Sequence, residues 1–205
     1  ARNGLVETKD YIVFVGTVLG TDMPVTANAH QKTYNGGWGD AYMTVISKDS
    51  LRRVYSTYLG GSGDENFLDL IEVSNNRVLL VGGGNSPDFP VTPNAWQPAL
   101  NDSAGYDDIL IGVFSLDEMR FEELTYVGGA SVDYAKSVVY DQGSNTASIL
   151  LRSHSTVFPL LPPKPENAQY RGAVLKYDLN TLPPGHAIPV VDIGNTALEK
   201  MITTS

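Results

Sequence analysis

The sequence has no cysteine among its 205 residues and few basic residues. The lack of cysteine excludes disulfide bonds, thiolate zinc sites and cysteine nucleophiles. The 14 Lys and Arg residues stand against 23 Asp and Glu residues, which leaves a formal net charge of −9. A chain without a basic surface lacks the charges that neutralise phosphates, so nucleic acid is not expected as a partner.

Long hydrophobic runs and metal-binding patterns are also missing. No apolar run approaches the 18 residues that a membrane-spanning helix requires, so no membrane span is expected. The three histidines, His30, His154 and His186, lie far apart in the sequence and form no metal-binding motif. We therefore expect no metal and no cofactor. A hydrophobic content of 42% with 18% charged residues is typical of a folded protein.

The sequence repeats itself at a spacing of about 66 to 69 residues. P-V-T-A-N-A-H-Q at 24–31 matches P-V-T-P-N-A-W-Q at 90–97, with six of the eight positions identical. Further along, S-T-Y-L-G-G matches L-T-Y-V-G-G and places Tyr58 opposite Tyr126. A third copy is more divergent, and its clearest trace is the F-P dipeptide at 158–159. Fixed-period repetition of this length predicts a fold built from stacked, similar units.

Each unit contains short apolar runs that are rich in Val, Ile, Leu and Tyr and are separated by glycine and proline. This pattern favours strands, four in each unit. In the middle copy the expected strands are residues 67–73, 78–81, 109–114 and 121–127. Four antiparallel strands at this period predict an all-β fold, a β-propeller with about three four-stranded blades.

The three blades are expected to divide the chain in sequence order. Blade one covers residues 1–66 and begins within its first strand, blade two covers 67–134, and the divergent blade three covers 135–205. Propellers normally close with four to eight blades, so we expect the chain to form part of a larger ring. Its expected partners are then the remaining blades of the same propeller or other protein chains. Because each blade depends on its neighbours for burial, the isolated chain is expected to fold poorly.

Two segments carry a resemblance to a known family. They are Y-S-T-Y-L-G-G-S-G-D-E at 55–65 and S-P-D-F-P-V-T-P-N-A-W-Q at 86–97. Together they resemble the SBBP-type bacterial β-propeller repeat. The resemblance implies an exported bacterial protein that is periplasmic, secreted or on the cell surface, and that acts as a structural or protein-interaction scaffold. It implies no catalytic residues, so we expect the chain not to be an enzyme.

Candidate binding residues gather in the loops expected on one face of the propeller. In the usual blade, the connections from the second to the third strand and from the fourth strand to the next blade lie on the same face. The candidates in these loops are Trp38, Asp40, Asp64, Glu65, Asp108 and Asp133. Carboxylates suit calcium, but Arg171 stands where the first two copies have aspartate, so no metal site is expected. The alternative is a solvated acidic rim that keeps the protein soluble.

Trp38 lies among glycines and has no aromatic counterpart assigned to it in the second copy. Such a tryptophan could stack on a sugar ring or on a partner, or it could be a loop anchor packed against its own blade. A carbohydrate-binding or polysaccharide-acting propeller is therefore the alternative function, with surface polysaccharide as its partner. A glycosidase would need two carboxylates at a defined separation, and the sequence indicates no such pair. The glycine-rich loop at 60–65 also departs from nucleophile-elbow, dinucleotide and calcium-binding motifs.

The repeated motif at 24–31 and 90–97 is expected to be architectural. Its glutamines, Gln31 and Gln97, recur at the repeat spacing, and we expect them to fix the long loops through hydrogen bonds to the backbone. His30 occupies the position of Trp96 in the second copy. We expect both rings to fill the same position between neighbouring blades.

Overall fold

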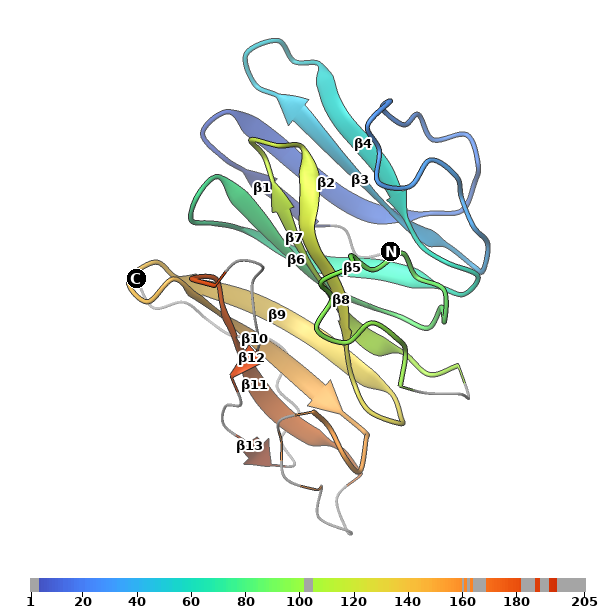
Figure 1. The fold of residues 1–205 in the computed structure, drawn as a ribbon, viewed down its shortest axis with the longest axis vertical. Helices are drawn as coiled ribbons and strands as arrows, with labels where there is room; N and C mark the ends of the chain where they lie inside the picture. The colour runs from blue at the N-terminus through green and yellow to red at the C-terminus, as the bar shows by residue number, and fades with distance from the viewer. Residues whose placement is uncertain are drawn as a thin grey trace.

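The computed structural model describes residues 4–101, 105–159, 161, 163, 169–181, 187–188 and 192–194. This part of the chain is all-β and forms three antiparallel sheets (Figure 1). The first sheet contains β1 (Gly4–Glu7), β2 (Tyr11–Val18), β3 (Asp40–Ser47) and β4 (Arg53–Leu59). No helix in the described residues is long and apolar enough to cross a membrane.

The second and third sheets follow in chain order. The second contains β5 (Glu65–Val73), β6 (Arg77–Gly84), β7 (Asp108–Ser115) and β8 (Arg120–Val127). The third contains β9 (Asp133–Asp141), β10 (Thr146–Ser153) and β11 (Arg171–Asp178), with β12 (Ala187–Ile188) and β13 (Asp192–Gly194) both paired to β11. The all-β prediction and the four strands expected in the middle copy are confirmed, with the strands slightly longer than expected.

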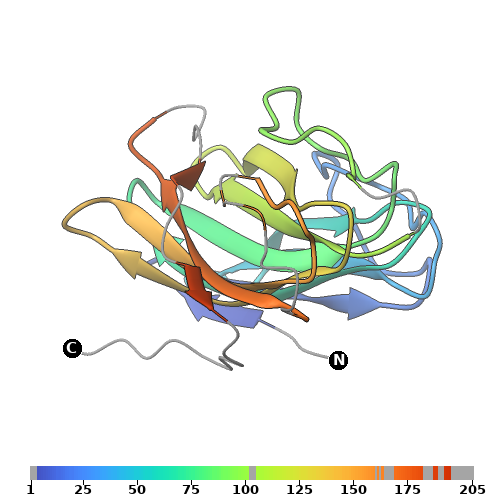
Figure 2. The ribbon, with the colours of Figure 1, turned by 90° about the horizontal axis from the view of Figure 1, so that it is seen from below.

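The sheets pack on one another, with the second sheet between the other two (Figures 1 and 2). One core cluster joins the first and second sheets through residues such as Met43, Tyr55 and Leu80. The other joins the second and third sheets through residues such as Leu79 and Ile149. Successive residues of a strand point to opposite faces, so Leu79 and Leu80 belong to different clusters. Strand β6 is buried along its whole length because it is covered on both faces.

Backbone hydrogen bonds join each sheet to the next at matched positions. The N–H of Glu65, at the start of β5, donates to the carbonyl of Gly39 at 2.9 Å. The N–H of Asp133, at the start of β9, donates to the carbonyl of Asp107 at 2.7 Å. In both cases the first residue of a new sheet is bonded to the loop just before the third strand of the previous sheet. The sheets are therefore held in register by bonds as well as by apolar packing.

His30 and Trp96 lie between neighbouring sheets, as expected. The His30 ring contacts Phe121 edge-to-face at 5.6 Å, and its Nε2 lies 2.9 Å from the carbonyl oxygen of Pro90. Trp96 packs against the cluster that joins the second and third sheets. The His30 ring is therefore carried by a loop of the first sheet and contacts the second sheet, and Trp96, carried by the matched loop of the second sheet, packs at the next junction.

The two interfaces between sheets differ at one matched pair of positions. Between the first and second sheets, Tyr55 packs against Phe114 with ring centroids 4.8 Å apart. Between the second and third sheets, the hydroxyl of Tyr177 donates a hydrogen bond to Glu123, and both side chains are buried. Burial raises the pKa of Glu123 from its ordinary 4.5 to about 7, although the bond from Tyr177 opposes this shift. The second interface thus contains a buried carboxyl group where the first has the ring of Tyr55.

We predict that the free energy of unfolding falls as the pH rises from 4.5, the ordinary pKa of Glu123, to about 7, its pKa in the folded protein. The folded state favours protonated Glu123, so its contribution is complete below pH 4.5 and is lost as the pH approaches about 7. The free energy of unfolding should fall by ~1 kcal/mol per pH unit across this interval. Denaturant unfolding at several pH values measures the slope, which Glu123→Gln should reduce.

The control is Glu118→Gln, which removes an exposed carboxylate that pairs with Arg120 on the surface. This variant should keep the slope of the parent protein. A slope that is the same in Glu123→Gln and in the parent would contradict the assignment. Other buried carboxyl groups whose pKa burial raises, Glu65 to about 7 and also Asp40 and Asp133, contribute to the part of the slope that remains in Glu123→Gln.

Candidate functional site

The long loops of the first two sheets lie at one end of the strands, and the short hairpins lie at the other (Figure 1). The long loops join β2 to β3 and β6 to β7, and they meet the connections that lead from β4 to β5 and from β8 to β9. This is the arrangement expected from the sequence for the candidate residues. We call this end of the molecule the loop face.

A glutamine fixes the long loop of the first sheet. The Oε1 atom of Gln31 accepts the N–H of Gly60 at 2.9 Å, and its Nε2 donates to the carbonyl of Thr33 at 2.7 Å and to Oδ2 of Asp40 at 3.4 Å. The side chain thus ties the loop to the start of β3 and to the end of β4. Gln31 is buried.

Gln97 makes the same three contacts in the second sheet. Its Oε1 accepts the N–H of Gly128 at 3.0 Å, and its Nε2 donates to the carbonyl of Ala99 at 3.0 Å and to Oδ2 of Asp108 at 2.9 Å. Gln97 is half-buried. The prediction that the two glutamines fix the long loops from matched environments is confirmed.

The buried aspartates explain why glycine follows β4 and β8. Asp40 and Asp108 are fully buried. A Cβ atom at Gly60 would lie 2.3 Å from Cγ of Asp40, and one at Gly128 would lie 2.0 Å from Oδ1 of Asp108. Non-bonded atoms do not approach this closely, so any side chain at either glycine would displace the aspartate. The first glycine of each pair is therefore required by packing against a carboxylate.

Glu65 and Asp133 hold the second glycine of each pair. The N–H of Gly61 donates to Oε2 of Glu65 at 2.7 Å, and the N–H of Gly129 donates to Oδ2 of Asp133 at 2.8 Å. Glu65 also accepts the N–H of Ser86 at 3.2 Å. Burial raises the pKa of Asp133 as well as that of Glu65, and the hydrogen bonds that they accept partly offset this effect. Both carboxylates are therefore bound to the turns that begin the next sheet.

The expectation of an exposed acidic rim is wrong for four of the five candidate acids. Asp40, Glu65, Asp108 and Asp133 are at most 1% exposed, and only Asp64 is partly accessible. The physical reason is that these loops contain N–H groups without a strand partner, and carboxylates accept them. Among the described residues, no group of three or more acids and histidines is placed to hold a metal ion.

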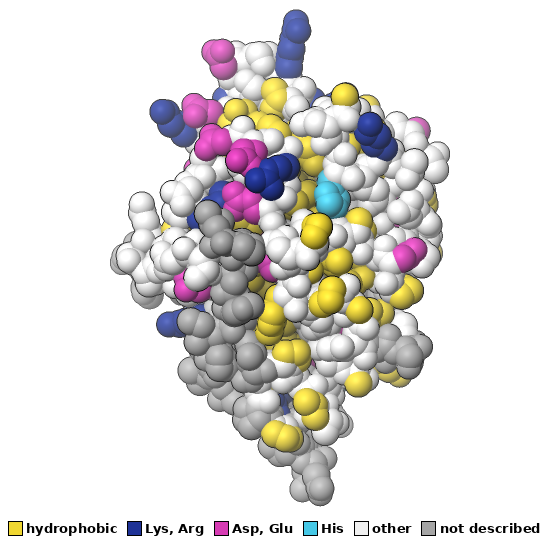
Figure 3. All heavy atoms as spheres, in the orientation of Figure 1, with side chains coloured by type: hydrophobic (Ala, Val, Ile, Leu, Met, Phe, Trp, Pro, Cys, Tyr) yellow, Lys and Arg dark blue, Asp and Glu magenta, His cyan; other side chains and the backbone are white. Residues whose placement is uncertain are grey.

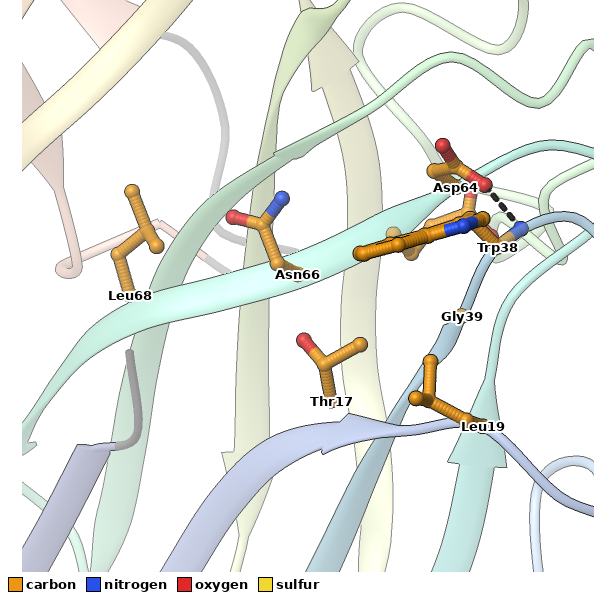
Figure 4. Close-up of a pocket in the computed structure, with 8 residues that line it drawn as sticks. Thr17, Leu19, Trp38, Gly39, Asp64, Asn66 and Leu68 are labelled. Atoms are coloured by element: carbon orange, nitrogen blue, oxygen red, sulfur yellow. Dashed lines mark hydrogen bonds between the residues drawn. The ribbon is translucent and has the colours of Figure 1, made fainter. Parts of the chain in front are cut away.

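Trp38 is the most exposed candidate, with 82% of its side chain accessible. It borders a cavity of about 520 Å³ whose walls come from the first two sheets and from the connection between them (Figure 4). The lining residues are Thr17, Leu19, Trp38, Gly39, Asp64, Glu65, Asn66 and Leu68. In Figure 4 the indole extends along the start of β5 towards Asn66, with Thr17 and Leu19 on its other side. Trp38, Asp64 and Glu65 are thus the predicted residues that the structure brings together.

The loop that carries Trp38 is fixed, although the indole is exposed. Its backbone N–H donates to Oδ1 of Asp64. Gly37 has a φ of +62°, and a Cβ atom there would lie 1.7 Å from the carbonyl oxygen of Gly63. The hydroxyl of Tyr34 donates to the carbonyl of Gly37 at 3.1 Å. The interpretation of Trp38 as an anchor packed against its own sheet is wrong, because its ring is exposed and the loop is held by other groups.

Trp38 does have an aromatic counterpart, contrary to the expectation from the sequence. Trp38 lies two residues before the aspartate that begins β3, and Tyr106 lies two residues before the aspartate that begins β7. Each follows a glycine with positive φ, Gly37 at +62° and Gly105 at +78°. Tyr106 is 46% exposed. The match is missed when the copies are aligned on the motif at 24–31, because the second loop is two residues longer.

Several polar groups in the Trp38 cavity are free to bind a ligand. The Asn66 amide and the Thr17 hydroxyl make no hydrogen bond with any described residue. Glu65 also borders the cavity, but its two oxygens accept backbone N–H groups. Thr17, Asn66 and their apolar neighbour Leu68 were not among the residues expected from the sequence. No motif marks them, and they lie at strand positions whose direction depends on the packing of two sheets.

No model of a known protein family matches the sequence, and a search of curated proteins finds no significant match.

We predict that Gly128→Ala destabilises the fold strongly, because the new methyl group would overlap the Asp108 carboxylate. The free energy of unfolding should fall by about 2–4 kcal/mol. Gly83→Ala is the matched control, since a Cβ atom there meets its nearest neighbour at an ordinary 3.4 Å. The control should change stability by less than about 1 kcal/mol. Equal losses at the two glycines in denaturant unfolding would show that the carboxylate contact is not the cause.

Proposed function

We propose that the chain is a non-catalytic part of a β-propeller in which each sheet is one blade. The protein is exported by a bacterium and acts as a structural or protein-interaction scaffold at the cell surface or in an extracellular assembly. Its nearest partners are further blades, from the same protein or from other chains. The extracytoplasmic location rests on the resemblance of the repeat to SBBP-type propellers.

The observation that carries this proposal is an apolar face of the first sheet that no other sheet covers among the described residues. In the second sheet, Val78, Leu80 and Phe114 are fully buried on the side that faces the first sheet. The matched residues of the first sheet are also apolar: Ile12, Phe14 and Ile46.

These residues of the first sheet are only partly buried. The contrast is greatest on the first strand of each sheet. Leu70 of β5, which pairs with Leu80, is 6% exposed, whereas the matched Leu5 of β1, which pairs with Phe14, is 65% exposed. Figure 3 shows hydrophobic side chains exposed on the face in view, in the upper part of the molecule and also further down. An apolar sheet face with the same pattern as a covered one favours a partner of the same kind, another β-sheet.

The loop face supports a scaffold better than an enzyme. Four of its acids are bound to backbone N–H groups and therefore stabilise the loops rather than face solvent. Loops fixed on a rigid sheet stack present a defined surface, which is the usual way that such folds bind partners. A polysaccharide-cleaving reaction would need two carboxylates free to act as acid and base, and the loops use their carboxylates for structure.

We predict that the 205-residue chain on its own associates through the free face of the first sheet. Its sedimentation should depend on concentration, and Phe14→Lys should weaken the association at least ~10-fold because it places a charge on the apolar face. Leu51→Lys is the control, since Leu51 is 78% exposed and lies on the β3–β4 turn. Circular dichroism checks that both variants keep their strands.

A longer natural chain that supplies the next blades should be monomeric and should melt at a higher temperature. The proposal is wrong if the 205-residue chain is a monomer at every concentration and shows a sharp, cooperative melt of its own. Association that Phe14→Lys leaves unchanged would also contradict it.

A further inference from the structure

We infer that the Trp38 cavity binds one pyranose ring of a neutral polysaccharide. This inference rests on the proposed function, in which the loop face is the binding surface of a non-catalytic module. It adds the site, the chemical class of the ligand and the side chains that contact it.

Trp38 is exposed in a loop that is otherwise fixed. Tryptophan has a large apolar surface and is usually mostly buried in a folded protein. In this loop 82% of the side chain remains accessible, while its backbone is bonded to Asp64 and the next residue, Gly39, is bonded to Glu65. The fold therefore holds the indole in place without covering it. An exposed aromatic ring in a fixed position is suited to stacking on a flat ligand.

Polar groups that can bond to a ligand surround the ring. The Asn66 amide offers donors and an acceptor, and the Thr17 hydroxyl offers one donor and acceptor sites. Neither makes a hydrogen bond with a described residue. Only Oδ1 of Asp64 accepts the Trp38 N–H, so its Oδ2 remains available. In Figure 4 the indole lies along the start of β5, with Asn66 on that strand and Asp64 just before it, and Thr17 lies across from the ring.

A pyranose ring matches this arrangement of groups. One of its faces presents C–H groups that pack on the negative face of an aromatic ring, and its rim presents hydroxyl groups that bond to amides, hydroxyls and carboxylates. Leu19 and Leu68 supply apolar parts of the cavity wall. A cavity of about 520 Å³ is of the size that holds a small ligand. Because the cavity is open to solvent, a polymer could continue on either side of the bound ring.

The charge of the loop face selects a neutral sugar over an acidic one. Asp64 lies in the cavity, and its charge helps to raise the pKa of Asp107, although burial is the larger cause. The two carboxylates are therefore close enough to repel each other. With a net charge of −9 for the chain, a uronic acid or a sulfated sugar would meet the same repulsion. A neutral pyranose would not.

The experiment uses the longest natural chain that contains these residues. The 205 residues include two tryptophans, so in this region Trp96→Phe leaves the fluorescence of Trp38 to be followed alone. Cellohexaose and chitohexaose are the neutral probes, and a galacturonic acid hexamer is the charged one. We expect at least one neutral probe to shift the Trp38 emission and to protect it from acrylamide quenching. The charged hexamer should bind at least ~10-fold more weakly.

Calorimetry with the neutral probe that binds then tests the residues. Trp38→Ala should weaken binding at least ~10-fold, and Trp38→Phe should recover part of the loss because it restores a ring. Tyr106→Ala is the matched control, since it removes the exposed aromatic side chain at the corresponding loop position of the next sheet. Its affinity should stay close to that of the parent.

Other results overturn the inference. They are the absence of binding by both neutral probes, equal binding by Trp38→Ala, an equal loss in Tyr106→Ala, and protection of Trp38 by a proline-rich peptide but by no sugar. The last result would assign the cavity to a protein partner. If the chain associates through the Phe14 face but binds no sugar, this inference is wrong and the proposed propeller stands. If it binds sugar but does not associate through that face, the proposed propeller is wrong.

Discussion

The structure depends on buried carboxylates that accept hydrogen bonds from loops. At the start of β3 and β7, Asp40 and Asp108 are bonded to a glutamine from the preceding long loop, and that glutamine also holds the glycine after the fourth strand. Strand pairing cannot satisfy these loop N–H groups, because the strands have ended. In each of the first two sheets, the carboxylate and the glutamine together join the long loop to the start of the third strand and the end of the fourth. This connection fixes each long loop near its end, and in the first sheet the bond from the Trp38 N–H to Asp64 then holds the segment that carries the ring.

The strands and their pairing could be predicted from the sequence, whereas the roles of the acids could not. Apolar runs such as that of β6 are local signals, and their length and spacing show a buried strand directly. The burial of Asp40 depends on Gly60 and Gln31, which lie 20 and nine positions away and form one environment only after folding. An aspartate that binds a turn and one that binds a metal have the same sequence context. The positions of these acids in the expected loops therefore indicate an exposed acidic face where the structure has buried connections.

The residues of the candidate site could likewise be predicted only in part. Trp38 could be identified from its glycine-rich surroundings, and Asp64 from its loop. Asn66 and Thr17 could not be identified, because they come from β5 and β2 and meet only where two sheets pack. Tyr106 was missed for a simpler reason, a difference of two residues in loop length. The third sheet departs further, since a buried Arg171 begins β11 where aspartate begins the matched strands. The start of β11 therefore cannot repeat the glutamine–aspartate contact of the first two sheets.

The Trp38 cavity has walls from two successive sheets, and this has a consequence for how such a protein changes over time. A cavity of this kind belongs to a junction rather than to a sheet, so a sheet that is duplicated on its own carries only half of it. An open row of sheets has one junction fewer than it has sheets, and a closed ring has equal numbers of both. Gain or loss of one unit therefore changes which residues face each other at a junction while every individual sheet stays the same. New specificity can arise in this way from the order of the units, before any residue of the cavity is substituted.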